Sequence, residues 1–144
     1  MTEISIKGVE PLIAILQKLP DDMQKKVGEK ALKDGANVIL EEAQNLVPEG
    51  ATGKLADSLA IGVVKGKVPK YRVYARRKKG FGGWHAHLVE FGTKPHMIGK
   101  KYHPGAPAKP FMRPALLTKK AETIKAVFEN LFKHITSTIK KEMK

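Results

Sequence analysis

A long apolar stripe near the end of the chain limits the folds that are open to it. From residue 113 to residue 141, apolar side chains recur at three- and four-residue spacing, and Pro114 suits a first helical turn. The stripe consists of Leu116, Leu117, Ala121, Ile124, Val127, Phe128, Leu131, Ile135 and Ile139. It predicts a helix of about four heptads, long enough for part of the stripe to pack on another chain.

A second stripe predicts a long helix in the N-terminal half. It begins at a cap formed by Asp21 or Asp22 and is closed by Pro48. Its apolar face consists of Met23, Val27, Ala31, Val38, Ile39, Ala43 and Leu46. Gly35 lies within this face at a cost of up to about 1 kcal/mol relative to Ala, so we expect another element to approach its backbone closely. A shorter helix is expected before Pro20, from the spacing of Val9, Leu12, Ile13, Leu16 and Leu19.

Two segments rich in β-branched and aromatic residues, 58–64 and 68–76, predict an antiparallel hairpin. Ile4 and Ile6 alternate with polar residues and indicate a short strand or extended arm. Residues 84–91 fit a third strand or a short helix. We therefore expect one α+β domain over residues 1–144, in which a small antiparallel sheet packs against the long N-terminal-half helix and the long C-terminal helix.

Two segments are predicted to be flexible loops. Residues 76–83 combine four successive cations with three glycines, and both features oppose a packed element. Residues 94–109 are rich in proline, glycine and lysine and offer no hydrophobic face to bury, which predicts a long surface loop. The segment from Pro48 to Asp57 is rich in turn-forming residues, and within it Thr52-Gly53-Lys54-Leu55 is expected to form a loop with a positive φ at Gly53 and an apolar anchor at Leu55.

Composition narrows the possible functions. The chain of 144 residues carries a formal charge of +13, which would attract nucleic acid, acidic proteins or anionic lipid. It contains no cysteine, so disulfides, thiolate metal sites and cysteine nucleophiles are excluded. No apolar run approaches the roughly 20 residues that cross a bilayer, and no leader is recognisable, so we expect a soluble intracellular protein without membrane contact.

Residues that could carry catalysis or bind a metal are few. His85, His87 and Glu90 would form a loose metal site if the segment were a strand, which leaves a metal-dependent nuclease as a weak possibility. Glu90 lies in an apolar run, and burial could raise its pKa for acid–base chemistry. We favour a structural carboxylate that pairs with Lys94 or Arg113 and so holds the two ends of the long loop. No metal site, cofactor or enzymatic activity is expected.

The cationic run offers a different possible function. Arg76, Arg77, Lys78 and Lys79 precede Phe81 and Trp84, a combination that is also found in nucleic-acid grooves. The two aromatic side chains could equally be hydrophobic anchors. A small basic nucleic-acid-binding module is therefore the alternative function.

Three motifs together resemble one family. The segments Val89-Glu90-Phe91-Gly92-Thr93 and Pro110-Phe111-Met112-Arg113-Pro114-Ala115, with Thr52-Gly53-Lys54-Leu55 before them, resemble the lambdoid-phage gene-product-ten-like family of tail components. The resemblance implies a virion structural protein, made in the host cytoplasm, that forms a sixfold ring at the neck of a long-tailed phage. The ring would complete the tail or join it to the head.

The resemblance also implies site residues and partners. The residues that match the family motifs are Thr52, Gly53, Leu55, Glu90, Phe91, Gly92, Thr93, Pro110, Phe111, Arg113 and Pro114. Neighbouring copies, head-completion proteins, and tail-tube or tail-terminator proteins would be the partners, and packaged DNA would cross the channel. The cations that could face DNA or a partner are Arg76, Arg77, Lys78, Lys79, Lys94, Lys100 and Lys101. Both loops would become ordered on assembly, with Phe111 anchoring the second.

Overall fold

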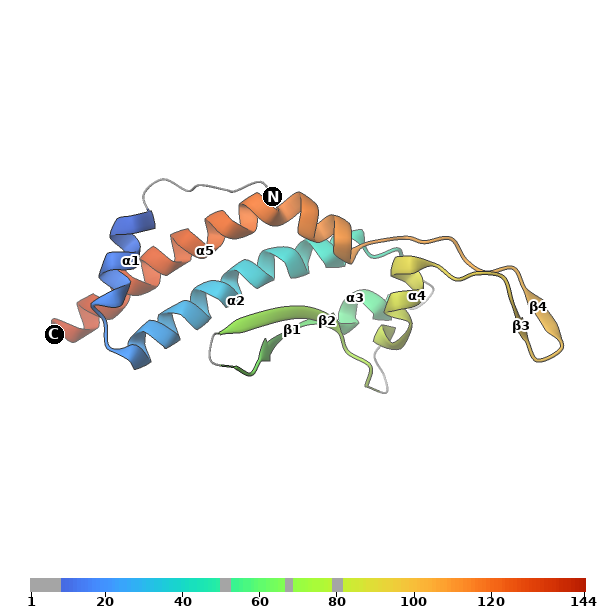
Figure 1. Ribbon diagram of the computed structural model, residues 1–144, viewed down its shortest axis with the longest axis horizontal. Coiled ribbons are helices and arrows are strands. Elements are labelled where there is room, and N and C mark those ends of the chain that lie inside the picture. The colour runs from blue at the N-terminus through green and yellow to red at the C-terminus, as the bar shows by residue number, and fades with distance from the viewer. Residues whose placement is uncertain (1–8, 50–52, 67–68, 79–81) are drawn as a thin grey trace.

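Two long antiparallel helices form the body of the molecule. The computed structural model describes residues 9–49, 53–66, 69–78 and 82–144. Helix α2 (Asp21–Leu46) and helix α5 (Met112–Glu142) lie side by side along the length of the molecule (Figure 1). Both match the predicted stripes closely, and Pro114 lies in the first turn of α5 as expected. The predicted α+β class is confirmed.

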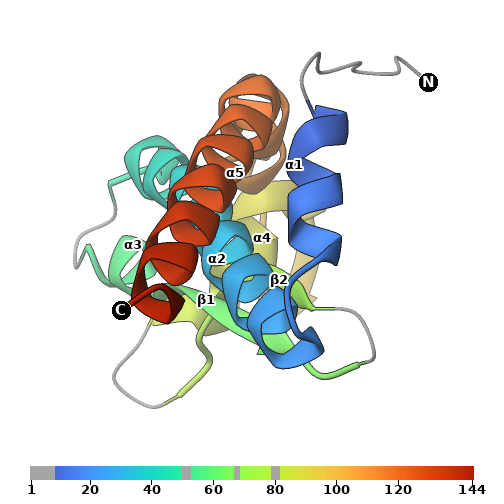
Figure 2. The ribbon, with the colours of Figure 1, turned by 90° about the vertical axis from the view of Figure 1, so that its left-hand side faces the viewer.

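Helix α1 (Val9–Gln17) covers one end of the helix pair. It lies beside the C-terminal half of α5, as the end-on view in Figure 2 makes clear. Val27 and Ala31 of α2 and Leu131 and Ile135 of α5 form a buried cluster there, which Leu16 of α1 helps to cover. The stripe on α5 is thus buried largely within its own chain at this end.

The start of α2 differs from the prediction. Pro20 occupies the N-cap position, and its carbonyl oxygen accepts hydrogen bonds from the backbone N–H groups of Met23 and Gln24, each at 2.9 Å. Asp21 and Asp22 lie in the first turn, where their charge favours the helix dipole without capping it.

The sheet forms one outer layer of the molecule. Strands β1 (Leu59–Val64) and β2 (Lys70–Ala75) are antiparallel, with Ile61 opposite Val73 and Val63 opposite Tyr71. They pack under α2, so α2 is the middle layer between the sheet and α5 (Figure 1). This hairpin confirms the prediction for residues 58–76. The expected strand at Ile4 and Ile6 falls outside the described residues.

Residues 82–91 are helical, which resolves the strand-or-helix alternative. A 3₁₀ turn, η1 (Gly82–His85), leads into helix α4 (Ala86–Phe91), while the short helix α3 (Lys54–Ser58) precedes β1. A second buried cluster joins these pieces to the ends of α2 and α5: Ala43, Leu55, Leu59, Phe111 and Ala115. In the ranges given above, every helix is too short or too polar to span a bilayer.

The segment predicted as a long loop contains a second hairpin. Strands β3 (His96–Ile98) and β4 (Lys101–His103) pair antiparallel and project beyond α4 at the end of the molecule (Figure 1). Every residue from 94 to 104 is exposed, so the segment has no buried face, as predicted. The prediction of a loop was wrong for residues 96–103, which form the two strands and their turn. The overlooked sequence signal was the two-residue Gly99–Lys100 turn between two short segments that contain Met97 and Tyr102.

Candidate functional site at the base of the projecting hairpin

Glu90 caps a helix that starts more than 20 residues further along the chain. The side chain is buried at the end of α4. One carboxylate oxygen accepts hydrogen bonds from the backbone N–H groups of Phe111 (2.8 Å) and Met112 (2.9 Å), and the other accepts from the N–H of Arg113 (3.0 Å). These are donors that α5 cannot satisfy internally, and its N-cap residue, Phe111, provides no side-chain cap. The negative charge also opposes the positive end of the α5 dipole.

Its surroundings keep Glu90 ionised. Burial acts to raise the pKa of Glu90, but the three backbone hydrogen bonds and the positive charge of Arg113 outweigh it, so the pKa lies below the ordinary glutamate value. A lowered pKa does not suit the general acid or base considered from the sequence. The structural role is the one observed, but the predicted partners are wrong: backbone amides, rather than the Lys94 or Arg113 side chain, hold the carboxylate.

The base of the projecting hairpin is held by backbone contacts. Thr93 and Ala106 exchange two backbone hydrogen bonds, at 2.8 and 3.1 Å, and the Lys109 N–H donates to the Val89 carbonyl at 2.8 Å. Gly92 permits this arrangement because its φ is +71° and an added Cβ would lie 2.7 Å from the Ala106 carbonyl oxygen. Together with the Glu90 cap, these contacts fix where the hairpin leaves the body and where it returns.

Phe111 and Leu55 bring the outer motifs of the resemblance to one place. Phe111 is almost fully buried, and it shares a cluster with Leu55 of α3. Gly53, the N-cap of α3, has the predicted positive φ of +61°, whereas Thr52 lies outside the described residues. Pro110 is exposed just before this cluster. The segments around residues 55, 90 and 111 therefore converge, although long stretches of chain separate them.

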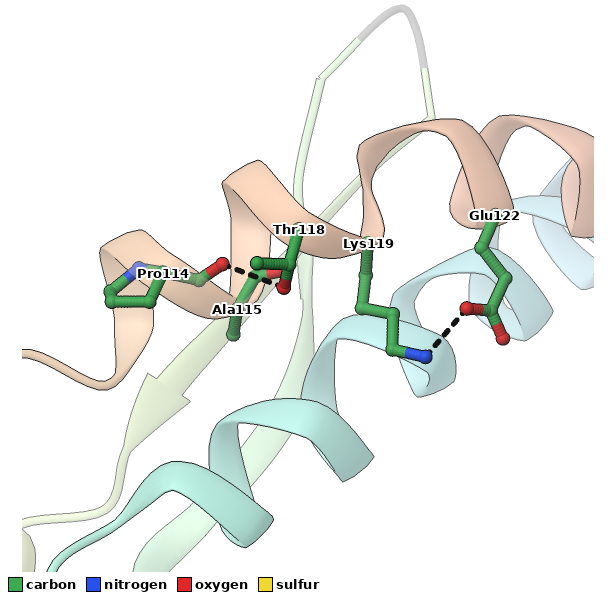
Figure 3. A network of polar contacts seen from close by, with 5 residues as sticks. All are labelled: Pro114, Ala115, Thr118, Lys119 and Glu122. Carbon is green, nitrogen blue, oxygen red and sulfur yellow. Dashed lines mark hydrogen bonds and ion pairs between the residues drawn. The ribbon is translucent and has the colours of Figure 1, made fainter.

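The first turn of α5 has additional local support. Pro114 accepts a hydrogen bond at its carbonyl oxygen from the Thr118 hydroxyl, at 2.9 Å (Figure 3). One turn later, Lys119 pairs with Glu122 at 2.6 Å, and this hydrogen bond, followed by the charges of Glu122, Glu42 and Glu41, raises the pKa of Lys119. The start of α5 is thus held both by its own turns and by Glu90.

An apolar groove lies beside this anchored base. It has a volume of about 520 Å³ and is bordered by the sheet, α2, α4 and the start of α5. Most of its walls are apolar: Ala36, Ile39, Leu59, Tyr71, Val73, Ala75, Ala86, Phe91, Phe111, Met112 and Leu116. The polar side chains in the lining are His87, Glu90 and Arg113, and Tyr71 adds a hydroxyl group. Phe91 and Leu116 are strongly exposed, so the apolar surface continues onto the groove's rim. Sequence reasoning missed this groove because its walls come from separate elements.

The predicted cationic residues that the structure describes come from two separate segments. Arg76 is used within the subunit, where its guanidinium donates to the Asp57 carbonyl at 3.0 Å and to the Ser58 carbonyl at 3.4 Å. Arg77 and Lys78 are exposed after β2, whereas Lys94, Lys100 and Lys101 belong to the projecting hairpin. Lys79 and Phe81 lie outside the described residues.

The arrangement near α4 does not assemble the metal site considered from the sequence. The carboxylate of Glu90 is occupied by backbone donors, while the His87 side chain is exposed. Within the described part of the chain, no three His, Asp or Glu side chains gather closely enough to hold a metal ion. Trp84, which could have been a hydrophobic anchor, is largely exposed and meets the His85 ring edge-on.

Comparison with known proteins connects this architecture to phages. The family model described as "Bacteriophage HK97-gp10, putative tail-component" matches residues 10–92. The match extends from α1 to the end of α4 and includes Gly53, Leu55 and Glu90, while the projecting hairpin and α5 lie beyond it. No curated protein and no solved structure matches the chain. Because the match covers more than half of the 144 residues, the chain belongs to the HK97-gp10-like family of bacteriophage tail components.

Proposed function

We propose that this protein is a virion structural protein that forms a sixfold ring at the neck of a long-tailed phage. In this position it completes the tail or joins it to the head. Family membership supports the virion role. The observation that carries the ring proposal is the projecting hairpin, whose Met97 and Tyr102 side chains are largely exposed.

The positions of the exposed apolar surfaces favour a ring over a pair of subunits. The projecting hairpin leaves the end of the molecule, whereas Phe91 and Leu116 expose apolar surface on the body beside the groove. Two different surfaces that meet head to tail form a heterologous interface, and such interfaces close into rings when the rotation permits. Above and below the ring, the proposed neighbours are head-completion proteins and tail-tube or tail-terminator proteins.

The family-motif residues have a structural role in this proposal. Glu90, Gly92 and Phe111 hold the base of the hairpin in one direction before assembly. A preset arm loses less conformational entropy on binding than a flexible loop does. In residues 94–109 the β3–β4 hairpin thus takes the place of the ordering on assembly that the sequence suggested, whereas ordering of residues 76–83 on assembly remains part of the proposal.

Particles that lack the protein provide the direct test. Phage particles produced without this chain should accumulate as filled heads and separate tails, because the joint between them is missing. Electron microscopy of those lysates would measure the fraction of joined particles, and supplying the intact chain should restore it. Normal joined particles without the chain would contradict the neck proposal.

A specific hollow favours an additional contact with DNA. It has a volume of about 560 Å³ and is lined in part by Arg72, Tyr74, Arg77 and His87. The guanidinium of Arg72 lies 4.8 Å from the centre of the Tyr74 ring, which holds that cation in place. Two arginines, an aromatic ring and an imidazole suit the phosphate backbone of DNA that passes through the channel.

A further inference from the structure

The β3–β4 hairpin has two chemically different faces. Met97 and Tyr102 are directly opposed across the strands and therefore share one face. The other face carries the cross-strand pairs His96–His103 and Ile98–Lys101, and the two imidazole rings lie 5.1 Å apart. The first face is thus uncharged, whereas the second carries Lys101. Met97 and Tyr102 are 59% and 63% exposed, although both are large apolar side chains.

This hairpin cannot cover the groove of its own subunit. The hydrogen bonds between Thr93 and Ala106 and the bond from Lys109 to Val89 hold its base beside α4. From that base the strands run away from the body, as Figure 1 shows. An isolated two-stranded hairpin is marginally stable in water, so a fixed arm of this kind gains most from packing on another surface.

The groove matches the uncharged face of the hairpin in chemistry. Most of its walls are apolar, and its polar lining includes the side chains of Arg113 and His87, which can hydrogen-bond a tyrosine hydroxyl. A buried tyrosine needs an apolar surface for its ring and a polar partner for its hydroxyl, and a methionine fills irregular apolar space. The Lys101 ammonium group would have to lose water in this mostly apolar groove, which is costly. The uncharged Met97–Tyr102 face therefore suits the groove better.

We propose that the Met97–Tyr102 face of each β3–β4 hairpin docks into the groove between the sheet, α4 and the start of α5 of an adjacent copy of this chain. The inference rests on the proposed ring and names the contact that closes it. Tyr102 packs its ring on the apolar walls and directs its hydroxyl toward Arg113 or His87 of the neighbour. The opposite face, with Ile98 and Lys101, remains in water.

Cysteine cross-linking tests this contact without background, because the chain has no cysteine of its own. Tyr102→Cys and Leu116→Cys chains are mixed in equal amounts, incorporated into particles and treated with a mild thiol oxidant. Leu116 lines the groove and is 52% exposed. The expected product is a covalent dimer that contains one chain of each kind, identified by mass spectrometry of the linked peptides.

A matched pair provides the control. Phe132 is also on α5 and is 61% exposed, but it does not line the groove. Mixing Tyr102→Cys with Phe132→Cys should give no linked product. Equal cross-linking in both mixtures, or a link from Tyr102→Cys to another virion protein alone, would overturn the docking contact while leaving the neck role intact. Particles that never contain the chain would instead reject the proposed function.

Replacing one residue on each face of the hairpin tests which face docks. Met97→Ser should reduce incorporation into particles at least about tenfold, the size of effect expected for a lost interface anchor. Ile98→Ser changes a residue of similar exposure on the opposite face and should leave incorporation within about twofold of the wild type. Both variants should keep the melting temperature of the isolated chain. Equal losses for the two variants would overturn the assignment of the face.

Discussion

At the scale of single residues, Glu90 connects the end of α4 to the start of α5. Three backbone donors surround its carboxylate, and all three belong to the start of α5. A charge-assisted hydrogen bond to a helix terminus contributes more than a neutral one, and a donor left without a partner in a buried place is costly. The consequence extends beyond α5, because the segment that returns from the projecting hairpin leads directly into these residues.

Glu90→Gln should destabilise the isolated chain by about 1–3 kcal/mol, since the amide removes the negative charge and replaces one acceptor oxygen with a donor. Urea unfolding followed by circular dichroism would measure the change. Glu129→Gln provides the control, because Glu129 makes only an exposed pair with Lys125 at 3.8 Å. The control should change stability by less than about 0.5 kcal/mol. Similar effects of both variants would argue against the capping role.

The lowered pKa of Glu90 predicts a pH dependence of definite sign. Because the folded chain binds the Glu90 proton less readily than the unfolded chain does, the stabilisation is complete above the ordinary value of 4.5. It is lost as the pH falls through the lower folded pKa. The difference in unfolding free energy between the wild type and Glu90→Gln should therefore be constant near neutral pH and shrink below about 4.5. A difference that widens on acidification would contradict this account.

At the scale of elements, the contact between α2 and α5 explains the glycine within a predicted apolar stripe. A Cβ added to Gly35 would collide with the Val127 side chain and lie 3.4 Å from the Thr123 carbonyl oxygen. The predicted close approach is confirmed, and its partner is α5. Glycine lowers the helix propensity of α2, but the missing side chain lets the axes of α2 and α5 come close together.

Two alanine substitutions in α2 should have opposite effects. Gly35→Ala should destabilise the chain by about 1–3 kcal/mol, because overpacking against Val127 exceeds the gain in helix propensity. Gly28→Ala should stabilise it by roughly 0.5–1 kcal/mol, since no atom lies within 4 Å of the added Cβ. Thermal and urea unfolding of the two variants would compare them. Stabilisation by Gly35→Ala would contradict the observed helix contact.

The hairpin base provides a second test at this scale. Gly92→Ala places a Cβ 2.7 Å from the backbone of Ala106 and Ala108 and imposes a strained positive φ. We expect the variant to disturb the direction of the hairpin and to reduce incorporation into particles. Gly99→Ala also strains a positive φ, of +62°, but its Cβ meets nothing within 4 Å. It should be tolerated better, as measured by copies per particle.

At the scale of the whole molecule, the charge of +13 is distributed over several segments. Arg76 is used within the subunit, the hairpin lysines lie on one projection, and Arg72 and Arg77 border the hollow beside the sheet. A distributed charge favours several partners over one continuous nucleic-acid groove. The DNA contact that we propose lies at the hollow.

Binding to unrelated DNA should therefore depend on the hollow. Replacing Arg72 and Arg77 together with Ala should weaken binding and reduce the slope of log affinity against log salt by about two. Replacing Lys140 and Lys141 with Ala removes the same charge from the far end of α5, where both side chains are exposed, and should have a smaller effect. Mobility shifts at several salt concentrations would measure both slopes. Equal changes would indicate attraction to net charge alone.

The sequence by itself determined the three longest helices, the first hairpin and the family, whereas it did not predict α3 and left residues 84–91 open as a strand or a helix. Each of these depends on local information: a periodic apolar stripe, a pair of β-rich segments, or a short motif such as Glu90 to Thr93. It also indicated that Gly35 needed a close neighbour and Gly53 a positive φ. Apolar periodicity specifies an element and its buried face, because both arise from neighbours within a few turns.

Only the tertiary structure decided what the buried faces and polar groups meet. The partners of Glu90 lie in α5, and they are backbone amides, which no side-chain pattern can reveal. The groove combines residues from the sheet, α2, α4 and α5, so its existence depends on packing rather than on any one segment. The direction of the hairpin likewise depends on contacts between residues 92–93 and 106–108, which form only when the chain folds back on itself.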